Sequence, residues 1–550
     1  MRTPIRILTA GIAAALLVLG TTACASDGGN NDPGTSGGIS AITVRGCTPQ
    51  SELLPTNTNE VCGGNILDAT EAKLIHYNAD DASPELDIAE SIETDDAINW
   101  TVKLKPGYMF QDGTEVKAHN FVDAWNWGAY GPNAQMNEYF FEMIEGYEDM
   151  QCGDADCKEV PVADSMKGLE VLDDYTFTIR TVAPTSNLTV RLGYTAFAPQ
   201  PDAFFASEDK LEFAKKPIAA GPFQVTSKTD TEIVIEKFEG YSGKFPGSVD
   251  KVTFKIYNDS TAAYQDVVAN NLDVTDLIPA DYLVADMWKQ DLVDSAGAPR
   301  WGTKDTGVFQ ALTFSPAKTD PGMADIRVRQ AISMAVDRSQ VVDIVFNNAR
   351  VAATGWTSPV VDGFSENQCT NCVFDPDRAK ELLAEAGGYP GPLELWINGD
   401  GGHQQWADAV CNQIKNNLEL ECLVQATPDF ATLRNKIKAR ELKGIMRAGW
   451  QMDYPSIENF LTPLYATGAS ANDSDFSNAN FDRLLREAAA ATTNDAANLL
   501  YQEAERVLDQ EMPAMPLWTQ QSQYGFSTNI KSIKMTPFST FDFGSVVLAS

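Results

Sequence analysis

Hydrophobic and polar positions predict both strands and helices in this chain. Residues 98–104 alternate, and apolar side chains occupy every second position up to the Pro106-Gly107 turn, as in a half-buried strand. Further strands are predicted at 74–77, 175–179, 309–314, 393–397 and 516–518. Apolar residues recurring at three and four positions predict helices at about 325–348, 375–388, 457–465 and 481–508.

The segment from Arg447 to Asp453 combines several chemically useful groups at a predicted strand end. An apolar run, Gly444-Ile445-Met446, leads into it, and Pro455 ends it. The segment presents a cation, a glycine that exposes the backbone, a large aromatic residue and an acid. These groups suit a ligand with a backbone to pair and a charge at each end. An ordinary strand end with one solvated ion pair is the alternative interpretation.

Composition and charge narrow the possible functions. The 550 residues are 43% apolar, enough for a large core and more than one lobe. The formal net charge is −35, and removal of a leader containing Arg2 and Arg6 would bring it near −37. Nucleic-acid binding needs a basic surface, so we expect no nucleic-acid partner.

The first 24 residues have the pattern of an export signal. Arg2 and Arg6 precede an apolar run from Ile7 to Leu19, which is shorter than the roughly 20 residues that span a bilayer. Gly20-Thr21-Thr22-Ala23-Cys24 resembles a lipobox, although Thr21 stands where Leu is usual. We therefore expect Cys24 to be lipidated; a secretory peptide cut near Ala23 or Ala25 is the alternative.

Cysteine usage indicates an oxidising compartment. Besides Cys24, eight cysteines remain, an even number that allows on the order of 100 connectivities. We expect sequence neighbours to pair because each pair bounds one loop: Cys47–Cys62, Cys152–Cys157, Cys369–Cys372 and Cys411–Cys422. Cys369 and Cys372 also have zinc-ligand spacing, but no second such pair exists and no His is near in sequence. We expect no metal site.

Several segments together resemble one protein family. Arg447-Ala448-Gly449-Trp450 with Asp453-Tyr454 is similar to a signature of extracytoplasmic oligopeptide-binding proteins of ABC importers, solute-binding protein family 5. Residues 110–125, Ala219-Ala220-Gly221-Pro222-Phe223 and the run 326–338 also resemble this family, in which they are structural. The resemblance extends from about residue 41 to 550.

The resemblance implies roles for individual residues. Asp453 would bind a peptide's α-amino group, the Gly449–Trp450 region would pair with its backbone, and Arg447 would help hold its carboxylate. His403, after the predicted strand 393–397, would meet that carboxylate when protonated. Three further contributions are weaker expectations: Tyr139 (or Tyr130) at the ligand's amino end, Trp518 lining the pocket, and an extended segment at 55–59.

The resemblance also implies a fold and the residue boundaries of its lobes. We expect an α/β, two-lobed periplasmic-binding-protein-like fold (type II, cluster C) with an extra subdomain in the first lobe. Residues 1–24 would be the lipoprotein signal peptide and 25–40 a flexible tether. Lobe I would comprise 41–75, 200–305 and 519–550, with the inserted subdomain at 76–199, and lobe II would comprise 306–518.

The predicted function is peptide capture at the outer face of the cell membrane. A monomer held by its N-terminal lipid would bind short peptides between its lobes and deliver them to ABC permease subunits. No nucleophile elbow, zinc-protease motif or phosphate-binding loop occurs, so we expect neither catalysis nor a cofactor. The alternatives are a binder of dipeptides, sugars or metal chelates, a peptide-signal sensor, and a secreted carboxylate-based hydrolase.

Overall fold

The computed structural model describes residues 40–549 except 155–156, 400–401, 429 and 470. The predicted signal peptide, Cys24 and the tether before Ser40 lie outside the described residues. Within the described part, no helix combines the length and apolar character needed to cross a membrane.

One 11-stranded mixed sheet connects the two ends of the described unit. Its main order is β15 (Cys422–Thr427), β14 (Leu393–Asn398), β16 (Ile445–Gln451), β12 (Trp301–Phe314), β17 (Ala514–Phe526), β11 (Val274–Thr275), β1 (Ala41–Gly46), β10 (Lys251–Ile256), β9 (Glu232–Lys237) and β8 (Phe223–Lys228). The short β13 (Arg350–Ala352) pairs with β17. Strands from both ends of the chain therefore meet in this sheet.

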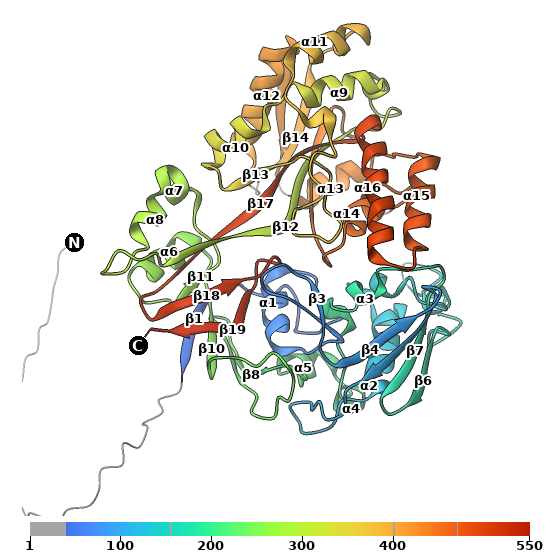
Figure 1. Ribbon diagram of the computed structural model, residues 1–550, viewed down its shortest axis with the longest axis vertical. Helices are drawn as coiled ribbons and strands as arrows, with labels where there is room; N and C mark the ends of the chain where they lie inside the picture. Colours follow the sequence, from blue (N-terminus) through green and yellow to red (C-terminus); the bar gives the residue numbers. More distant parts are fainter. Residues whose placement is uncertain (1–39, 155–156, 400–401, 429, 470, 550) are drawn as a thin grey trace, which may run out of the picture. The chain divides into compact units, whose positions relative to one another are not determined.

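The long strands β12 and β17 join the two halves of the sheet. They run antiparallel from Trp301 opposite Gly525 to Thr313 opposite Ala514, with register shifts near Asp305. In Figure 1 they pass between the part that contains α9–α12 and the part that contains β1 and β8–β11. This arrangement agrees with the expectation that the strand at 309–314 crosses between lobes, whereas the residue limits of the lobes stay a prediction.

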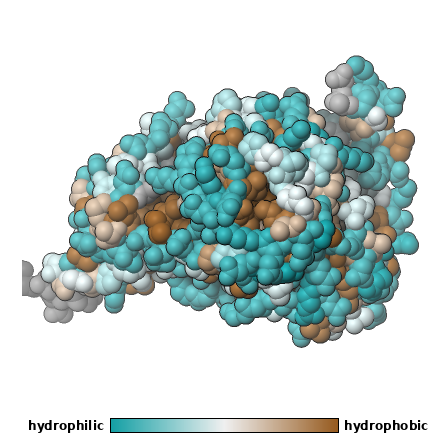
Figure 2. All heavy atoms as spheres, turned by 90° about the horizontal axis from the view of Figure 1, so that it is seen from above, coloured by the Kyte–Doolittle hydropathy of each residue, from teal (hydrophilic) through white to brown (hydrophobic). Residues whose placement is uncertain are grey.

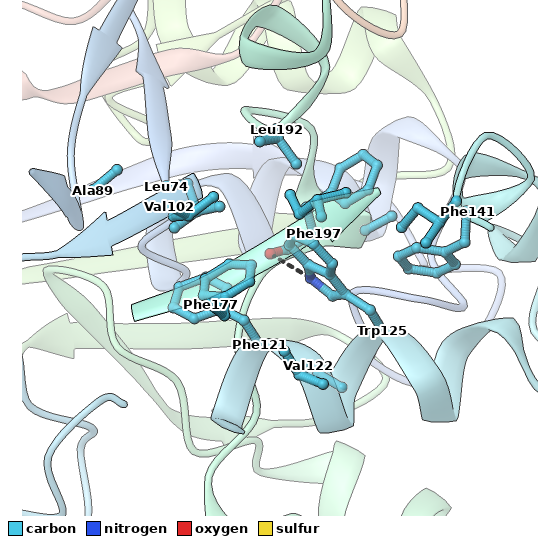
Figure 3. Close-up of a cluster of buried hydrophobic side chains, with 14 of the residues drawn as sticks. Leu74, Ala89, Val102, Phe121, Val122, Trp125, Phe141, Phe177, Leu192 and Phe197 are labelled. Atoms are coloured by element: carbon cyan, nitrogen blue, oxygen red, sulfur yellow. Dashed lines mark hydrogen bonds between the residues drawn. The ribbon is translucent and has the colours of Figure 1, made fainter. Parts of the chain in front are cut away.

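A four-stranded sheet with its own core is inserted after the first strands. Its order is β4 (Ala89–Thr94), β5 (Asn99–Leu104), β7 (Thr176–Arg180) and β6 (Leu169–Asp173). The predicted alternation in β5 is observed, because Trp100, Val102 and Leu104 are buried. Helix α2 (Ala118–Ala129) packs Phe121 and Trp125 against this sheet, and the Trp125 indole N–H donates to the carbonyl of Phe197 at 3.1 Å (Figure 3).

Other elements complete this half of the protein. They are the strands β2 (Ile75–Tyr77), β3 (Pro84–Leu86), β18 (Ile530–Met535) and β19 (Phe541–Leu548), and the helices α1 (Val61–Thr70), α3 (Leu188–Arg191), α4 (Asp202–Ala206), α5 (Lys210–Lys215), α6 (Ser260–Val268), α7 (Ala280–Leu283) and α8 (Met287–Asp291).

The helical stretch predicted at 325–348 is two helices, so the expectation of one continuous helix was wrong. α9 (Ile326–Met334) ends at Ala335, and α10 (Arg338–Phe346) starts anew because the Asp337 carboxylate accepts the N–H of Gln340 at 3.0 Å. Arg338 is 4% exposed and donates to backbone carbonyls that include Pro516 in β17. The break thus places a buried cation that ties α10 to the central sheet.

The remaining helices surround the other half of the sheet. They are α11 (Pro376–Glu385), α12 (Gln404–Leu418), α13 (Phe430–Lys438), α14 (Glu458–Tyr465), α15 (Ala479–Ala489) and α16 (Asn494–Glu511). The helical region predicted at 481–508 is also divided, because the Thr493 side chain caps a new helix by accepting the N–H of Ala496.

All four expected cysteine pairs are disulfide-bonded. The S–S distances are 1.97 Å for Cys47–Cys62, 1.98 Å for Cys152–Cys157, 1.99 Å for Cys369–Cys372 and 1.95 Å for Cys411–Cys422. Cys369 and Cys372 are therefore not zinc ligands here. In the described residues no group of three or more His, Cys, Asp or Glu side chains is arranged to hold a metal ion.

Candidate functional site

Strand β16 has one paired edge and one largely open edge. It pairs with β12 along its whole length, from Phe314 opposite Ile445 to Val308 opposite Gln451. On its other side, the pairing with β14 ends at Met446. From Ala448 to Gln451 this edge therefore has no strand partner among residues 40–549 as described. Unpaired N–H and C=O groups on a strand edge are a template for an extended chain.

Asp453 follows the end of β16 and lines a cavity of about 210 Å³, called here the Asp453 cavity. The walls come from β16 and its continuation, from the region around α1 and β2, and from residues that precede β19. The lining residues that matter below are Asn59, Lys73, Tyr77, Tyr194, Asp453 and Phe538. The face seen from above in Figure 2, on which no residue is labelled, is mostly hydrophilic, with hydrophobic residues gathered in a recess.

The Asp453 carboxylate is held in place by a neighbouring amide. Asn459 donates from Nδ2 to Oδ2 of Asp453 at 3.0 Å and accepts the backbone N–H of Asp453 at 2.9 Å. Asp453 forms no ion pair within the described part of the chain. Burial raises its pKa from 3.8 to about 6, because desolvation disfavours the charged form. The cavity thus holds a carboxylate that a ligand cation would stabilise.

Aromatic side chains surround this carboxylate. Tyr77 stacks on Phe538 with ring centroids 5.0 Å apart and donates its hydroxyl to the carbonyl of Val190 at 2.7 Å. Gly193 allows Tyr77 to approach, since a Cβ at that position would lie 2.4 Å from the Tyr77 ring. Tyr77 and Tyr194 were missed in the sequence, because nothing in their local pattern distinguishes them from core aromatics.

The tyrosine expected at the ligand's amino end occupies a less direct position. Tyr139 is 45% exposed and packs on Phe140, which in turn stacks on Tyr194. Tyr139 is not among the described residues that line the Asp453 cavity. Burial is the main reason why the pKa of the Tyr139 hydroxyl is raised, and the negative charge of Asp453 is the second. Tyr130 ends α2 and also lies outside the cavity wall. A ligand contact by Tyr139 stays a prediction.

Arg447, Gly449 and Trp450 line a second cavity of about 190 Å³, called here the Arg447 cavity. The Arg447 guanidinium lies over the Phe430 ring at 5.5 Å. A Cβ at Gly449 would lie 3.1 Å from Nη2 of Arg447, so glycine leaves room for the guanidinium. Trp450 connects this cavity with Asp453, because its indole N–H donates at 3.0 Å to the same Asn459 oxygen that accepts the Asp453 N–H.

A buried ion pair lies beside Asp453 and was not predicted from the sequence. Arg191, at the end of α3, donates to Oε2 of Glu458 at 3.0 Å, and the Tyr454 hydroxyl donates to the same oxygen at 2.7 Å. Asn187 also donates to it at 3.0 Å. Arg191 therefore pairs with Glu458, and its charge also lowers the pKa of Asp453, but Asp453 forms no ion pair of its own within the described residues. The two partners are 267 positions apart, and no local pattern links them.

Two other residues expected at the ligand, His403 and Trp518, lie outside both cavities. His403 precedes α12 and accepts the Trp406 indole N–H at 3.2 Å, and it lines neither cavity. Trp518 is 3% exposed and packs on Phe346 and Trp406. Trp518 lines neither cavity, and a ligand contact by this side chain stays a prediction.

The segment at 55–59 is only partly extended. Residues 55–57 form a turn in which the N–H of Asn57 and that of Thr58 both donate to the carbonyl of Leu54. Asn137 fixes this turn by donating to the carbonyls of Pro55 and Thr58. The expected extension is wrong for residues 55–57, whereas Thr58 and Asn59 do line the Asp453 cavity.

Comparisons with known proteins agree with this architecture. The chain is 23% identical over 543 residues to the oligopeptide-binding protein OppA of Bacillus subtilis (strain 168), covering 94% of this chain and 95% of that protein. It is 27% identical over 446 residues to the periplasmic murein peptide-binding protein MppA of Escherichia coli (strain K12), covering 78% and 79%.

The solved structure of HbpA2 from Haemophilus parasuis superposes with a TM-score of 0.78 at 21% identity, over 93% of this chain and 100% of that one. The predicted two-lobed α/β fold is thereby confirmed. The family described as "Bacterial extracellular solute-binding proteins, family 5 Middle" matches residues 83–472. This chain therefore belongs to the bacterial extracellular solute-binding proteins of family 5.

Proposed function

We propose that this protein captures short oligopeptides with a free amino terminus and delivers them to the permease of an ABC importer. The observation that carries the proposal is Asp453, a half-buried carboxylate without an ion-pair partner in the described chain, at the end of a strand with an open edge. A peptide's α-ammonium would supply the missing counter-charge. The names of relatives that bind oligopeptides and murein peptides support the same ligand class.

The open edge of β16 accounts for binding that does not depend on peptide sequence. An extended peptide would pair its backbone with Ala448–Gln451, so main-chain hydrogen bonds supply affinity whatever the side chains are. Arg447, at the opposite end of this strand segment from Asp453, would bind the peptide's carboxylate through an ion pair. Six strand positions separate Arg447 from Asp453, or roughly 20 Å at about 3.3 Å per residue. After allowing for the reach of the Arg447 side chain, this distance suits peptides of about three to five residues.

The protein's place in the cell belongs to the same proposal. Lipidation at Cys24 would anchor a monomeric binding protein outside the membrane, and the four disulfides fit an oxidising extracytoplasmic compartment. The family consists of solute-binding proteins, and we propose that this member likewise binds its ligand without chemical turnover.

Binding of acetylated and free peptides tests the amine contact directly. We would titrate the purified protein with Ala-Ala-Ala and with its N-acetylated copy and follow the thermal unfolding midpoint. Acetylation removes the positive charge while the peptide backbone stays the same. Stabilisation by the free peptide alone is the expected result. Equal stabilisation by both peptides would remove Asp453 from the binding site, and no response to either would refute the peptide ligand.

A further inference from the structure

A third cavity, of about 80 Å³, shares a wall with the Asp453 cavity. Three residues, Asp68, Tyr77 and Phe538, line both. We call it the acidic cavity because four carboxyl groups line it, those of Asp68, Glu71, Asp87 and Asp542. Its other walls are largely aromatic, from Tyr241, Phe245 and Phe541 among others. A water molecule needs only about 10–15 Å³ by this type of measure, so the space suits an ammonium or guanidinium head.

Glu71 is the group in this cavity that lacks a partner. It is 5% exposed, and its Oε2 atom accepts no hydrogen bond from any residue that the structure describes. The neighbouring cation, Lys73, donates instead to Asp68 at 3.1 Å. A buried oxygen without a hydrogen-bond donor lowers the stability of the fold. A ligand that donates a hydrogen bond to Glu71 would restore this lost free energy.

Apart from the Lys73–Asp68 pair, the acids of this cavity form no ion pair within the described residues. Burial lowers the pKa of His76 to about 4, so its imidazole is uncharged at neutral pH. Lys244 pairs with Glu85, outside the cavity lining. Asp87 accepts the Tyr108 hydroxyl at 2.8 Å, and Asp542 accepts the N–H of Gly544 at 2.8 Å. Neither of these acids forms an ion pair in the described part of the chain.

We propose that the acidic cavity is a specificity subsite for the cationic side chain, Lys or Arg, of the first residue of the bound peptide. The proposal rests on the proposed function, because the α-ammonium at Asp453 is what places the first side chain next to the shared wall. Carboxylates and aromatic ring faces together are the groups that recognise ammonium and guanidinium ions. The matched ligand class is therefore peptides that begin with a basic residue.

Binding of a cation in the acidic cavity should release a proton to the solvent. Burial raises the pKa of Glu71 to about 8, so the empty protein holds a proton on this carboxyl at pH 7. A bound ammonium or guanidinium favours the carboxylate, and the proton leaves to the solvent. The titratable groups that share the cavity lining with Glu71 are Asp68, His76, Asp87 and Asp542, and the nearby Lys73 lowers the Glu71 pKa without offsetting the effect of burial. Close to one proton should therefore be released at pH 7 beyond what a neutral side chain causes.

Matched peptides and variants test the subsite. Calorimetry at pH 8 would compare Arg-Ala-Ala with citrulline-Ala-Ala, whose side chain has nearly the same shape but no charge. We expect the wild-type protein to bind the arginine peptide at least about tenfold more tightly. Repeating the titrations at pH 7 in buffers of different ionisation enthalpy would measure the proton release. Glu71→Gln and, separately, Asp542→Asn should bring the affinity ratio toward one, whereas the exposed control Glu90→Gln should keep it.

The outcomes separate the two proposals. If Ala-Ala-Ala and both test peptides fail to bind, the proposed function fails. If all tripeptides bind but arginine and citrulline peptides have equal affinities, the subsite is refuted and Glu71 is satisfied by buried water only. A preference that survives both Glu71→Gln and Asp542→Asn would also refute it, because the cation would then be recognised elsewhere. Because Glu71→Gln and Asp542→Asn are tested separately, the proposal can still be tested if one of the two variants fails to fold.

Discussion

Replacing Asp453 with Asn is predicted to stabilise the empty protein while it removes most of the peptide affinity. Burial raises the pKa of this carboxyl from 3.8 to about 6. Each pKa unit corresponds to about 1.4 kcal/mol between the two protonation states. The two-unit shift therefore means that ionised Asp453 costs the fold about 3 kcal/mol. An amide of the same shape avoids this cost and still accepts a hydrogen bond from Asn459.

The pH dependence of this cost has a definite sign. Below pH 3.8 the carboxyl is protonated in both the folded and the unfolded chain, so Asp453 carries no penalty. Between pH 3.8 and 6 the unfolded chain loses the proton first, and the free energy of unfolding falls as pH rises. Above pH 6 the full penalty is present. Asp453→Asn should therefore raise the free energy of unfolding in urea by about 3 kcal/mol at pH 8 and by almost nothing at pH 3.5.

Peptide affinity should change in the opposite direction. Stripping one partner from a buried charge pair costs about 2–5 kcal/mol, or tens to thousands of fold in Kd. Calorimetric titration with Ala-Ala-Ala at pH 8 measures this loss, and Asp95→Asn, an exposed acid in a turn, is the control. Wild-type affinity should also weaken as pH falls below 6, whereas the variant's should not. Unchanged affinity in Asp453→Asn would refute the amine contact, and unchanged stability at pH 8 would refute the burial cost.

Three other perturbations test the surrounding structure. Gly449→Val should push aside the Arg447 guanidinium and weaken tripeptide binding about tenfold or more by calorimetry; unchanged affinity would contradict a ligand role for this cavity. Arg191→Met leaves Glu458 buried without its ion pair and should lower the free energy of unfolding by about 3–5 kcal/mol, whereas adding Glu458→Gln, which removes the charge but still accepts from Asn187 and Tyr454, should recover most of the loss; no recovery would mean that packing, not charge, is responsible. Replacing Cys47 and Cys62 together by Ser should cost roughly 3 kcal/mol of stability in urea, and a loss under about 1 kcal/mol would contradict the loop-closure estimate.

Local patterns predicted most of the elements, because strand alternation and helix capping act over a few residues. The alternation at β5 and the disulfide between Cys369 and Cys372 both follow from sequence neighbours. Helix continuity was harder to predict. A run such as 325–348 keeps its apolar spacing across Asp337, and this continuous spacing hid the local cap between the Asp337 carboxylate and the N–H of Gln340 that divides the run.

The site was predictable only where one short segment carries it. Arg447, Gly449, Trp450 and Asp453 lie within seven positions, so their chemistry could be recognised together. Tyr77, Tyr194 and Arg191 reach the same place from distant segments, and a single sequence gives no sign of their convergence. Trp518 illustrates another limit: the sequence does not show whether a lone tryptophan lines a pocket or packs in the core, and in the structure its ring packs on Phe346 and Trp406.

The buried and half-buried acids of this protein differ in how they are paired and in whether they line a cavity. Glu458 is fully compensated by Arg191, Asn187 and Tyr454, and these contacts keep its pKa low despite burial. Asp453 is half-buried and Glu71 is buried; both lack an ion pair among the described residues, and desolvation raises both pKa values. Glu505 is a further buried acid without an ion pair in the described chain, but it accepts the N–H of Trp356 and lines none of the three cavities. Asp453 and Glu71, in contrast, line two cavities that share a wall, as a binding site for two cationic groups of one peptide, its amino terminus and its first side chain, would require.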